Sequence, residues 1–189
     1  LNKADMMSQS EQPNILYIHT DQHTPFVTGC YGDPLVQTPN LDRLASQGTI
    51  FDAAYCTSPI CVPARMSMLT GLHPFQNEVW TNEHILSSGL PTLAHSFGAA
   101  GYEPVMIGRM HARGPDQLRG YVERLVGDHC PNYAAGSSPA RGGLRGTNLP
   151  NRLSLERSGA GQSAYEIHDE EVTTATINYL NQYASMKKS

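Results

Sequence analysis

Short apolar runs rich in β-branched and aromatic residues alternate along this chain with segments that carry helix start and stop signals. The run NILYIHT occupies residues 14–20, directly after Pro13, and the run YEPVMIG occupies residues 102–108. Between them, residues 38–48 and 91–101 each have a proline near the start and a glycine at the end, which is typical of helices. Residues 49–56, TIFDAAYC, are expected to be a further strand or an extended segment that leads to Cys61. Because strands that alternate with helices form parallel sheets, we expect an α/β fold with two or three core strands.

The rest of the chain divides into a helix that begins at Cys61, a long irregular stretch and a last helix. Residues 127–162 are rich in Gly, Ser, Pro and Arg, so we expect an irregular loop or insertion there. Residues 1–12 are expected to be a disordered or trimmed N-terminus, and residues 13–189 one domain with an incomplete sheet. The last helix is expected from Ile167, and one face of it carries Val172, Ala175, Tyr179 and Tyr183.

Charge and composition bear on partners and on location. The net charge of −4 and the pI near 6.0 do not favour binding to nucleic acid or to an anionic membrane. No stretch reaches the roughly 18 apolar residues of a membrane span, and the N-terminus lacks the apolar centre of a secretion signal. We therefore expect a cytoplasmic protein, with a leader removed before Leu1 as the alternative. Three of the four cysteines are expected to be ordinary reduced thiols: Cys30, Cys56 and Cys130.

The residues that follow the expected strands are suited to binding an oxyanion beside a metal ion. Asp21 comes directly after the first strand, and Arg109 and His111 follow the second. Ligands of open α/β sheets bind beyond the carboxyl ends of the strands. Cys61 opens a helix with Arg65 one turn further on, and the N-terminus of a helix favours anions. The order of the sequence permits these groups to converge, although a buried thiol that precedes a helix is the alternative for Cys61.

Three motifs in this order resemble those of the sulfatase family, within the alkaline-phosphatase superfamily. CVPARMSMLTG, which begins at Cys61, matches the family's C-x-P-x-R-x-x-x-x-x-G box. PNILYIHTDQ resembles the family's opening strand and metal-binding turn, and GRMHARGPDQLRGY resembles its later G-K-x-H box. The resemblance implies an alkaline-phosphatase-like, doubly wound, mostly parallel sheet with helices on both faces. Residues 13–189 are then the N-terminal part of a sulfatase catalytic domain, incomplete in this chain.

The chemistry that the resemblance implies is sulfuric ester hydrolysis. Cys61 is then oxidised to formylglycine by a formylglycine-generating enzyme, which reads the motif of Cys61, Pro63 and Arg65. One oxygen of the aldehyde hydrate attacks the sulfur of a sulfate monoester and expels the alcohol, and the other oxygen expels sulfate and restores the aldehyde. Arg65, Arg109 and His111 are the other expected catalytic residues.

A divalent cation beside the nucleophile is also implied, most simply Ca²⁺, with Mn²⁺ or Mg²⁺ as alternatives. The expected ligands are Asp21, Gln22 and the modified Cys61. Gln22 stands where the family usually has a second acid, but an Asp-Gln pair also occurs in a branch of sulfatases and related phosphonate ester hydrolases. A phosphonate monoester or phosphodiester hydrolase is therefore an alternative. Arg109 stands where lysine is usual, and its planar fork is expected to reduce or alter activity.

The resemblance places the family's remaining metal and sulfate ligands downstream of position 189. We therefore expect the isolated chain to be a fragment that does not turn over alone and that needs the C-terminal half of the same domain. A non-catalytic anion- or metal-binding fragment is the alternative of another class. The expected substrate is a small-molecule or saccharide sulfate ester. His23 is expected at the rim of the site, and Trp80 and Asn82 are weaker candidates for the pocket around the leaving group.

Overall fold

A computed structural model describes residues 12–128 and 159–186 of the chain. The chain divides into two compact units, Leu1–Ala54 and Tyr55–Ser189, and each is described by itself. Most of the expected irregular stretch and all but one residue of the expected disordered start lie outside the described residues. Among the described helices, none combines the length and the apolar character that a membrane span requires.

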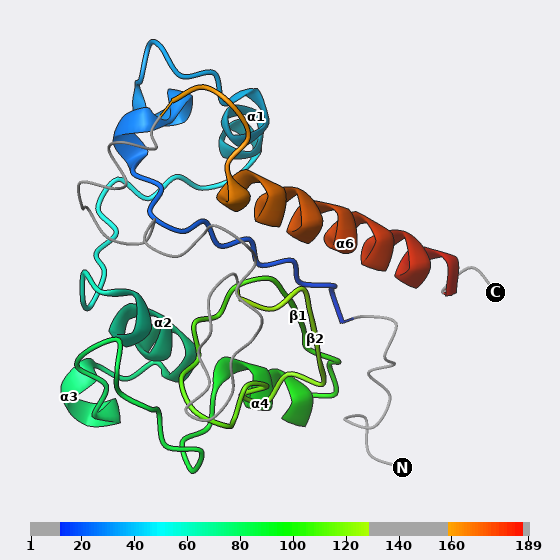
Figure 1. Ribbon diagram of the computed structural model, residues 1–189. Coiled ribbons are helices and arrows are strands. Elements are labelled where there is room, and N and C mark those ends of the chain that lie inside the picture. Colours follow the sequence, from blue (N-terminus) through cyan, green and yellow to red (C-terminus); the bar gives the residue numbers. More distant parts are fainter. Residues whose placement is uncertain (1–11, 129–158, 187–189) are drawn as a thin grey trace. The chain divides into compact units, whose positions relative to one another are not determined.

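The N-terminal unit contains the helix α1, Pro39–Gln47, which confirms the helix predicted for this part of the chain (Figure 1). Thr38 precedes the helix, but its hydroxyl makes no capping bond; it accepts the N–H of Gly29 at 2.8 Å and donates to Asp42 at 2.9 Å. A Cβ at position 29 would lie 2.6 Å from the carboxylate of Asp42, so any residue other than glycine would force the side chain of Asp42 to shift. Among the described residues before α1, the chain forms two 3-10 helices: η3, Pro25–Val27, and η4, Gly29–Tyr31.

The prediction of a strand at residues 14–20 is wrong for the described structure. No strand is assigned there, and the apolar side chains of residues 15–18 are between 56% and 73% exposed. A buried strand needs a hydrogen-bonded neighbour and a covering layer, and the described part of the N-terminal unit contains no other strand. The segment at residues 49–56, expected to be a strand or simply extended, has no assigned strand either.

The C-terminal unit contains a two-stranded parallel sheet. Its strands are β1, Val105–Ile107, and β2, Glu123–Leu125, and Met106 lies opposite Arg124 in the register. The strand predicted at residues 102–108 is thus confirmed for its middle part. β2 was not predicted, because three residues with two charges show no alternation of apolar and polar side chains. The parallel pairing confirms the α/β class.

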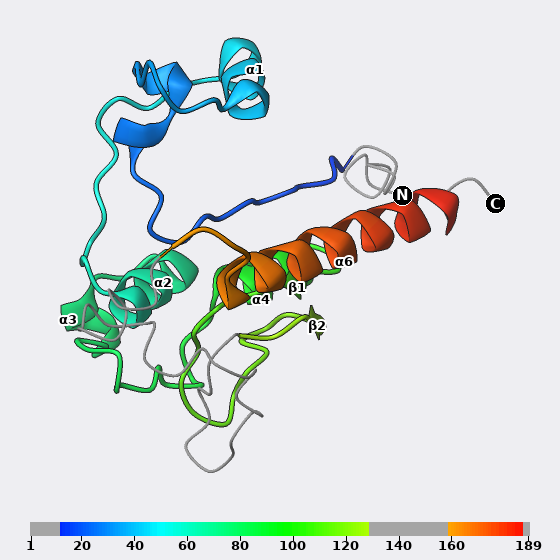
Figure 2. The same ribbon diagram turned by 45° about the horizontal axis from the view of Figure 1, so that its top comes forward.

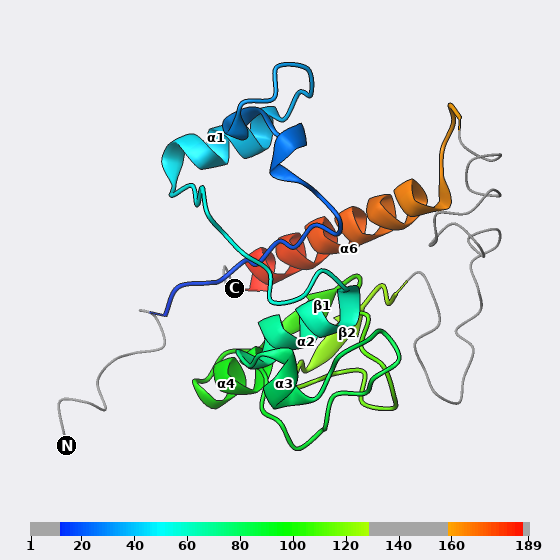
Figure 3. The same cartoon turned by 90° about the vertical axis from the view of Figure 1, so that its left-hand side faces the viewer.

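Helices lie on both faces of this sheet (Figures 1 and 3). The helix α6, Ala164–Met186, contacts β1 on one face, while α2, Cys61–Thr70, and α4, Leu93–Ala99, lie on the other. The short α3, Pro74–Asn77, packs beside α2 (Figure 2). The helix α6 begins before the predicted start, and the four side chains predicted to share its inner face are half-buried.

One apolar core joins α2, β1 and the loops around them. A helix and a loop that share a buried core move together, because close-packed side chains leave little room for independent shifts. The core therefore couples the position of Cys61, the first residue of α2, to that of the loop after β1. The buried members of the core are Val62, Met66, Leu69, Val79, Leu86, Met106, Met110 and Ala112.

Gly108 is the residue at which the chain leaves β1. Its N–H donates to the carbonyl of Leu125 at 2.9 Å, and its backbone is left-handed, with φ at 99°. A Cβ at this position would lie 3.1 Å from the side chain of Val172 on α6. Both the backbone conformation and the contact with α6 therefore favour glycine here, and the loop that follows carries Arg109 and His111.

Candidate active site

The candidate nucleophile lies at the start of α2. Cys61 is the first residue of the helix and is half-buried. Arg65 follows four residues later, so the two side chains share one side of the helix, and only 5% of Arg65 is exposed. Pro63 is buried in the first turn, where a helix tolerates a missing N–H. The helix predicted to begin at Cys61 is confirmed.

Asn82 holds the N-terminus of α2 from outside the helix. Ile60 precedes the helix and has no capping side chain, but Oδ1 of Asn82 accepts the N–H of Val62 at 2.8 Å. Since Pro63 has no N–H and that of Val62 is engaged, an anion at this end meets the helix dipole but fewer backbone donors than expected. Trp80, the other candidate for the leaving-group pocket, is 52% exposed.

Arg65 connects α2 to the loop after β1. Its Nη1 donates to the carbonyl oxygen of Arg109 at 2.9 Å. This bond crosses 44 positions of sequence, and it brings the motif that begins at Cys61 into contact with the motif that begins at Gly108, within the C-terminal unit. A nearly buried guanidinium at this point also places positive charge beside the first turn of α2, as an oxyanion site requires.

His111 is neutral and carries its proton on Nε2. Nη2 of Arg109 lies 3.0 Å from Nδ1 of His111, and because a guanidinium only donates hydrogen bonds, Nδ1 must accept. Burial, and then the charge of Arg109, lower the pKa of His111 to about 4; Arg65 and Arg113 act in the same direction, and Asp128 opposes them. At neutral pH the ring therefore offers an Nε2–H donor and no basic nitrogen.

This environment of His111 predicts a specific pH dependence of stability. The unfolded chain binds the proton with a pKa near 6.5 and the folded chain with a pKa of about 4. The free energy of unfolding should therefore rise as the pH increases from about 4 to 6.5, by roughly 2 kcal/mol after discounting for the solvent access of the ring. His111→Asn, which suits the left-handed backbone at this position, should remove this rise. Urea unfolding of both proteins across this range measures it, and equal slopes would contradict the account.

Asp21 and Gln22 belong to the N-terminal unit, so the structure does not place them relative to Cys61. Within the described residues, no group of three or more His, Cys, Asp or Glu side chains could hold a metal ion. The donor types are nevertheless informative. A carboxylate and an amide oxygen suit a hard cation such as Ca²⁺ or Mg²⁺, whereas the thiol of Cys61 does not. The expected ligand set fits such a cation only if position 61 presents oxygen.

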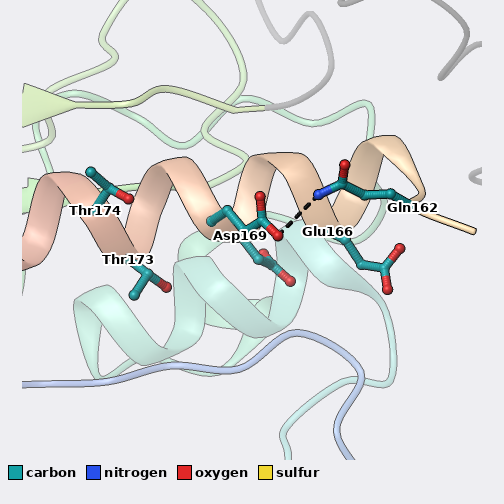
Figure 4. Close-up of a pocket in the computed structure, with 6 residues that line it drawn as sticks. Gln162, Glu166, Asp169, Thr173 and Thr174 are labelled. Atoms are coloured by element: carbon teal, nitrogen blue, oxygen red, sulfur yellow. Dashed lines mark hydrogen bonds between the residues drawn. The ribbon is translucent and has the colours of Figure 1, made fainter.

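A shallow hollow on the surface of α6 is a poor alternative site for an oxyanion. Its lining side chains all come from α6 and from Gln162 just before it (Figure 4). Three carboxylates, of Glu166, Asp169 and Glu170, would repel a sulfate group. The one side-chain amide among the lining residues is that of Gln162, and its Nε2 already donates to Glu170 at 3.0 Å. The cluster around Arg65, Arg109 and His111 is the better candidate.

Sequence comparison identifies the family. The family model described as Sulfatase matches residues 13–189, almost the whole chain. The chain therefore belongs to the sulfatase family. The choline-sulfatase of Rhizobium meliloti (strain 1021) is 39% identical over 120 residues, which cover 64% of this chain and 23% of that protein.

Two solved structures confirm the expected fold. One, a protein in complex with its substrate D-glucosamine-2-N,6-O-disulfate, is 34% identical with a TM-score of 0.57, over 60% of this chain and 23% of that one. The other, the phosphonate monoester hydrolase of Agrobacterium radiobacter, is 27% identical with a TM-score of 0.56, over 60% of this chain and 26% of that one. The chain thus spans at most 26% of the length of each of these three relatives.

Proposed function

We propose that the protein to which this chain belongs hydrolyses sulfate monoesters, with Cys61 as the precursor of a formylglycine nucleophile. The observation that carries the proposal is the Arg65–Arg109 contact, which joins the helix of Cys61 to the loop of His111 in a member of the sulfatase family. The cluster has the positive charge that a sulfate ester needs. The substrates named for relatives, choline sulfate and a sulfated glucosamine, favour a small-molecule or saccharide alcohol.

The residues of the cluster have complementary roles in this reaction. Converted to formylglycine by a formylglycine-generating enzyme and hydrated, the side chain at position 61 presents two hydroxyl groups. One oxygen bonds to sulfur while the ester bond breaks and the alcohol leaves with a proton; loss of the proton of the second hydroxyl re-forms the aldehyde and releases sulfate. Arg65 and Arg109 offset the negative charge, and the Nε2–H of His111 donates to an oxygen of the reacting group. Arg109 offsets this charge with a planar guanidinium group rather than with a compact ammonium group such as that of lysine.

The proposal includes a hard divalent cation, Ca²⁺ first, with Asp21 and Gln22 as oxygen ligands beside position 61. The cation would supply positive charge to the sulfate oxygens. Removal of the cation from the whole protein with a chelator should lower kcat by at least about 100-fold, and added Ca²⁺ should restore it. Asp21→Ala should reproduce this loss, whereas Asp33→Ala serves as a control, since Asp33 accepts only local N–H groups at 2.7 and 3.0 Å. Full activity after exhaustive chelation would refute the cation.

A second candidate function follows from the likeness to a phosphonate monoester hydrolase and from the Asp21–Gln22 pair. Rates of the whole protein on an aryl sulfate and on the matching aryl phosphonate ester separate the two. We expect kcat/KM to be higher for the sulfate by more than about tenfold. A faster phosphonate reaction would replace the proposed function with this second one. No turnover of either ester, with tight binding of sulfate, would indicate a non-catalytic anion-binding protein.

A further inference from the structure

The loop after β1 must satisfy its backbone without a neighbouring strand. β1 ends at Ile107, and the backbone is then left-handed at Gly108, with φ at 99°, and at His111, with φ at 58°. Left-handed backbone at a residue other than glycine costs roughly 1–2 kcal/mol. His111 therefore keeps this conformation only because surrounding contacts hold it there.

Asp128, three residues beyond β2, supplies these contacts. Its Oδ1 accepts the N–H of Met110 at 2.8 Å and that of His111 at 3.0 Å. Its Oδ2 lies 2.8 Å from Nη2 of Arg124, and the side chains of Asp128 and Arg124 are only 4% and 8% exposed. Burial raises the pKa of the Asp128 carboxyl, but the charge of Arg124 and the backbone N–H groups outweigh it and lower the pKa. The group is therefore a carboxylate at neutral pH.

The contacts continue from Asp128 to the helix that begins with Cys61. Arg109 lies in the same turn, and its carbonyl accepts the bond from Arg65 while its guanidinium donates to His111. A shift of this turn would therefore change the direction of the His111 ring and the contact with α2 together. Asp128 anchors the turn to the end of β2, across 17 positions of sequence.

We propose that Asp128 is a positioning residue of the candidate active site, which holds the turn at Met110 and His111 and thereby aims the Nε2–H of His111. The catalytic consequence rests on the proposed function; the effect on the His111 ring does not. Because only 4% of its side chain is exposed, Asp128 is expected to act through the turn that it holds rather than on the substrate. Truncating it would leave two backbone N–H groups and the charge of Arg124 without their partner, and such losses are costly in a buried setting.

The test compares Asp128→Ala with Asp128→Asn in the whole protein. Asparagine keeps an oxygen that accepts both N–H groups but loses the charge and the second oxygen, which faces Arg124, whereas alanine removes both oxygens. Asp116→Ala is the matched control: Asp116 also accepts a backbone N–H, from Arg119 at 3.0 Å, and lies 3.3 Å from the guanidinium of Arg119. Its partners do not include the turn at His111.

Two readouts distinguish positioning from general stability. Nitrogen NMR of the His111 ring reports the tautomer, and kcat and KM for an aryl sulfate report the chemistry. We expect Asp128→Ala to mix the two tautomers and to lower kcat by about 100-fold at a nearly constant KM. Asp128→Asn should keep the Nε2–H tautomer and stay within about tenfold of the unaltered kcat. Asp116→Ala should change neither readout.

Unaltered ring-nitrogen signals in Asp128→Ala, or equal changes in Asp116→Ala, would overturn the proposal. If Asp128→Ala does not fold, amide hydrogen exchange in the unaltered protein decides: protection of the Met110 and His111 amides bears the proposal out, and exchange at the rate of a free peptide overturns it. If the unaltered protein hydrolyses no sulfate ester, the proposed function fails, while the ring-nitrogen signals still decide whether Asp128 positions His111.

Discussion

Cys61→Ala should abolish sulfate ester hydrolysis by the whole protein, with kcat lowered by at least about 10⁴-fold. The reason is that no other group in the cluster of Arg65, Arg109 and His111 is a nucleophile, because guanidinium groups only donate and the Nδ1 of His111 already accepts a bond. KM should change little, because Arg65, Arg109 and His111, which are proposed to bind the sulfate group, are still present. The measurement is steady-state kinetics on an aryl sulfate.

Cys56→Ala is the matched control for this variant. Cys56 is exposed, lies five positions before Cys61, and donates through its Sγ to the carbonyl of Ser58 at 2.8 Å. Its loss should leave kcat within about twofold. Equal losses in both variants would point to a general effect of thiol removal, and a Cys61→Ala protein that keeps its activity would exclude a nucleophile derived from Cys61.

Arg119→Ala should destabilise the fold by about 3–5 kcal/mol. The side chain of Arg119 is 1% exposed, and its guanidinium donates to the carbonyls of Leu86 at 2.9 Å and Arg113 at 3.1 Å. Its Nη1 also lies 3.3 Å from the carboxylate of Asp116. Truncation leaves a cavity, and it removes the hydrogen-bond donor of the two carbonyls and the cation that faces Asp116. Each of these losses lowers the free energy of unfolding. Urea unfolding of the purified protein measures the loss.

A second arginine provides the comparison. Arg113 pairs with Glu83 at 2.7 Å, but the two side chains are 26% and 80% exposed. Arg113→Ala should therefore cost no more than about 1 kcal/mol, as is usual for surface ion pairs. If Arg119→Ala destabilises no more than Arg113→Ala, the buried guanidinium does not have the structural role described.

The helices could be predicted from the sequence because their signals are local. Proline and glycine at the two ends predicted α1 and α4, and the apolar period predicted the inner face of α6. Strands depend on partners that are distant in sequence. Residues 14–20 have strand composition without an assigned strand, and β2 is a strand of three residues without strand composition.

The candidate site could be predicted in part for the same reason. The motifs pointed to Cys61, Arg65, Arg109 and His111, and the structure brings the last three together. Two contacts of this site were not predicted: the bond from Val62 to Asn82, which spans 20 positions, and the bonds that Asp128 accepts. Both join a side chain to a distant backbone N–H, and only the folded chain shows which amide lacks a partner.

The proposed mechanism depends most directly on the chemical state of position 61. Mass spectrometry of the peptide that contains Cys61, from protein isolated from its native host, measures this state. We predict the loss of mass that corresponds to a thiol replaced by an aldehyde, while the peptide that contains Cys56 alone retains its thiol. An unmodified Cys61, in a host that converts other proteins with the same motif, would contradict the formylglycine mechanism.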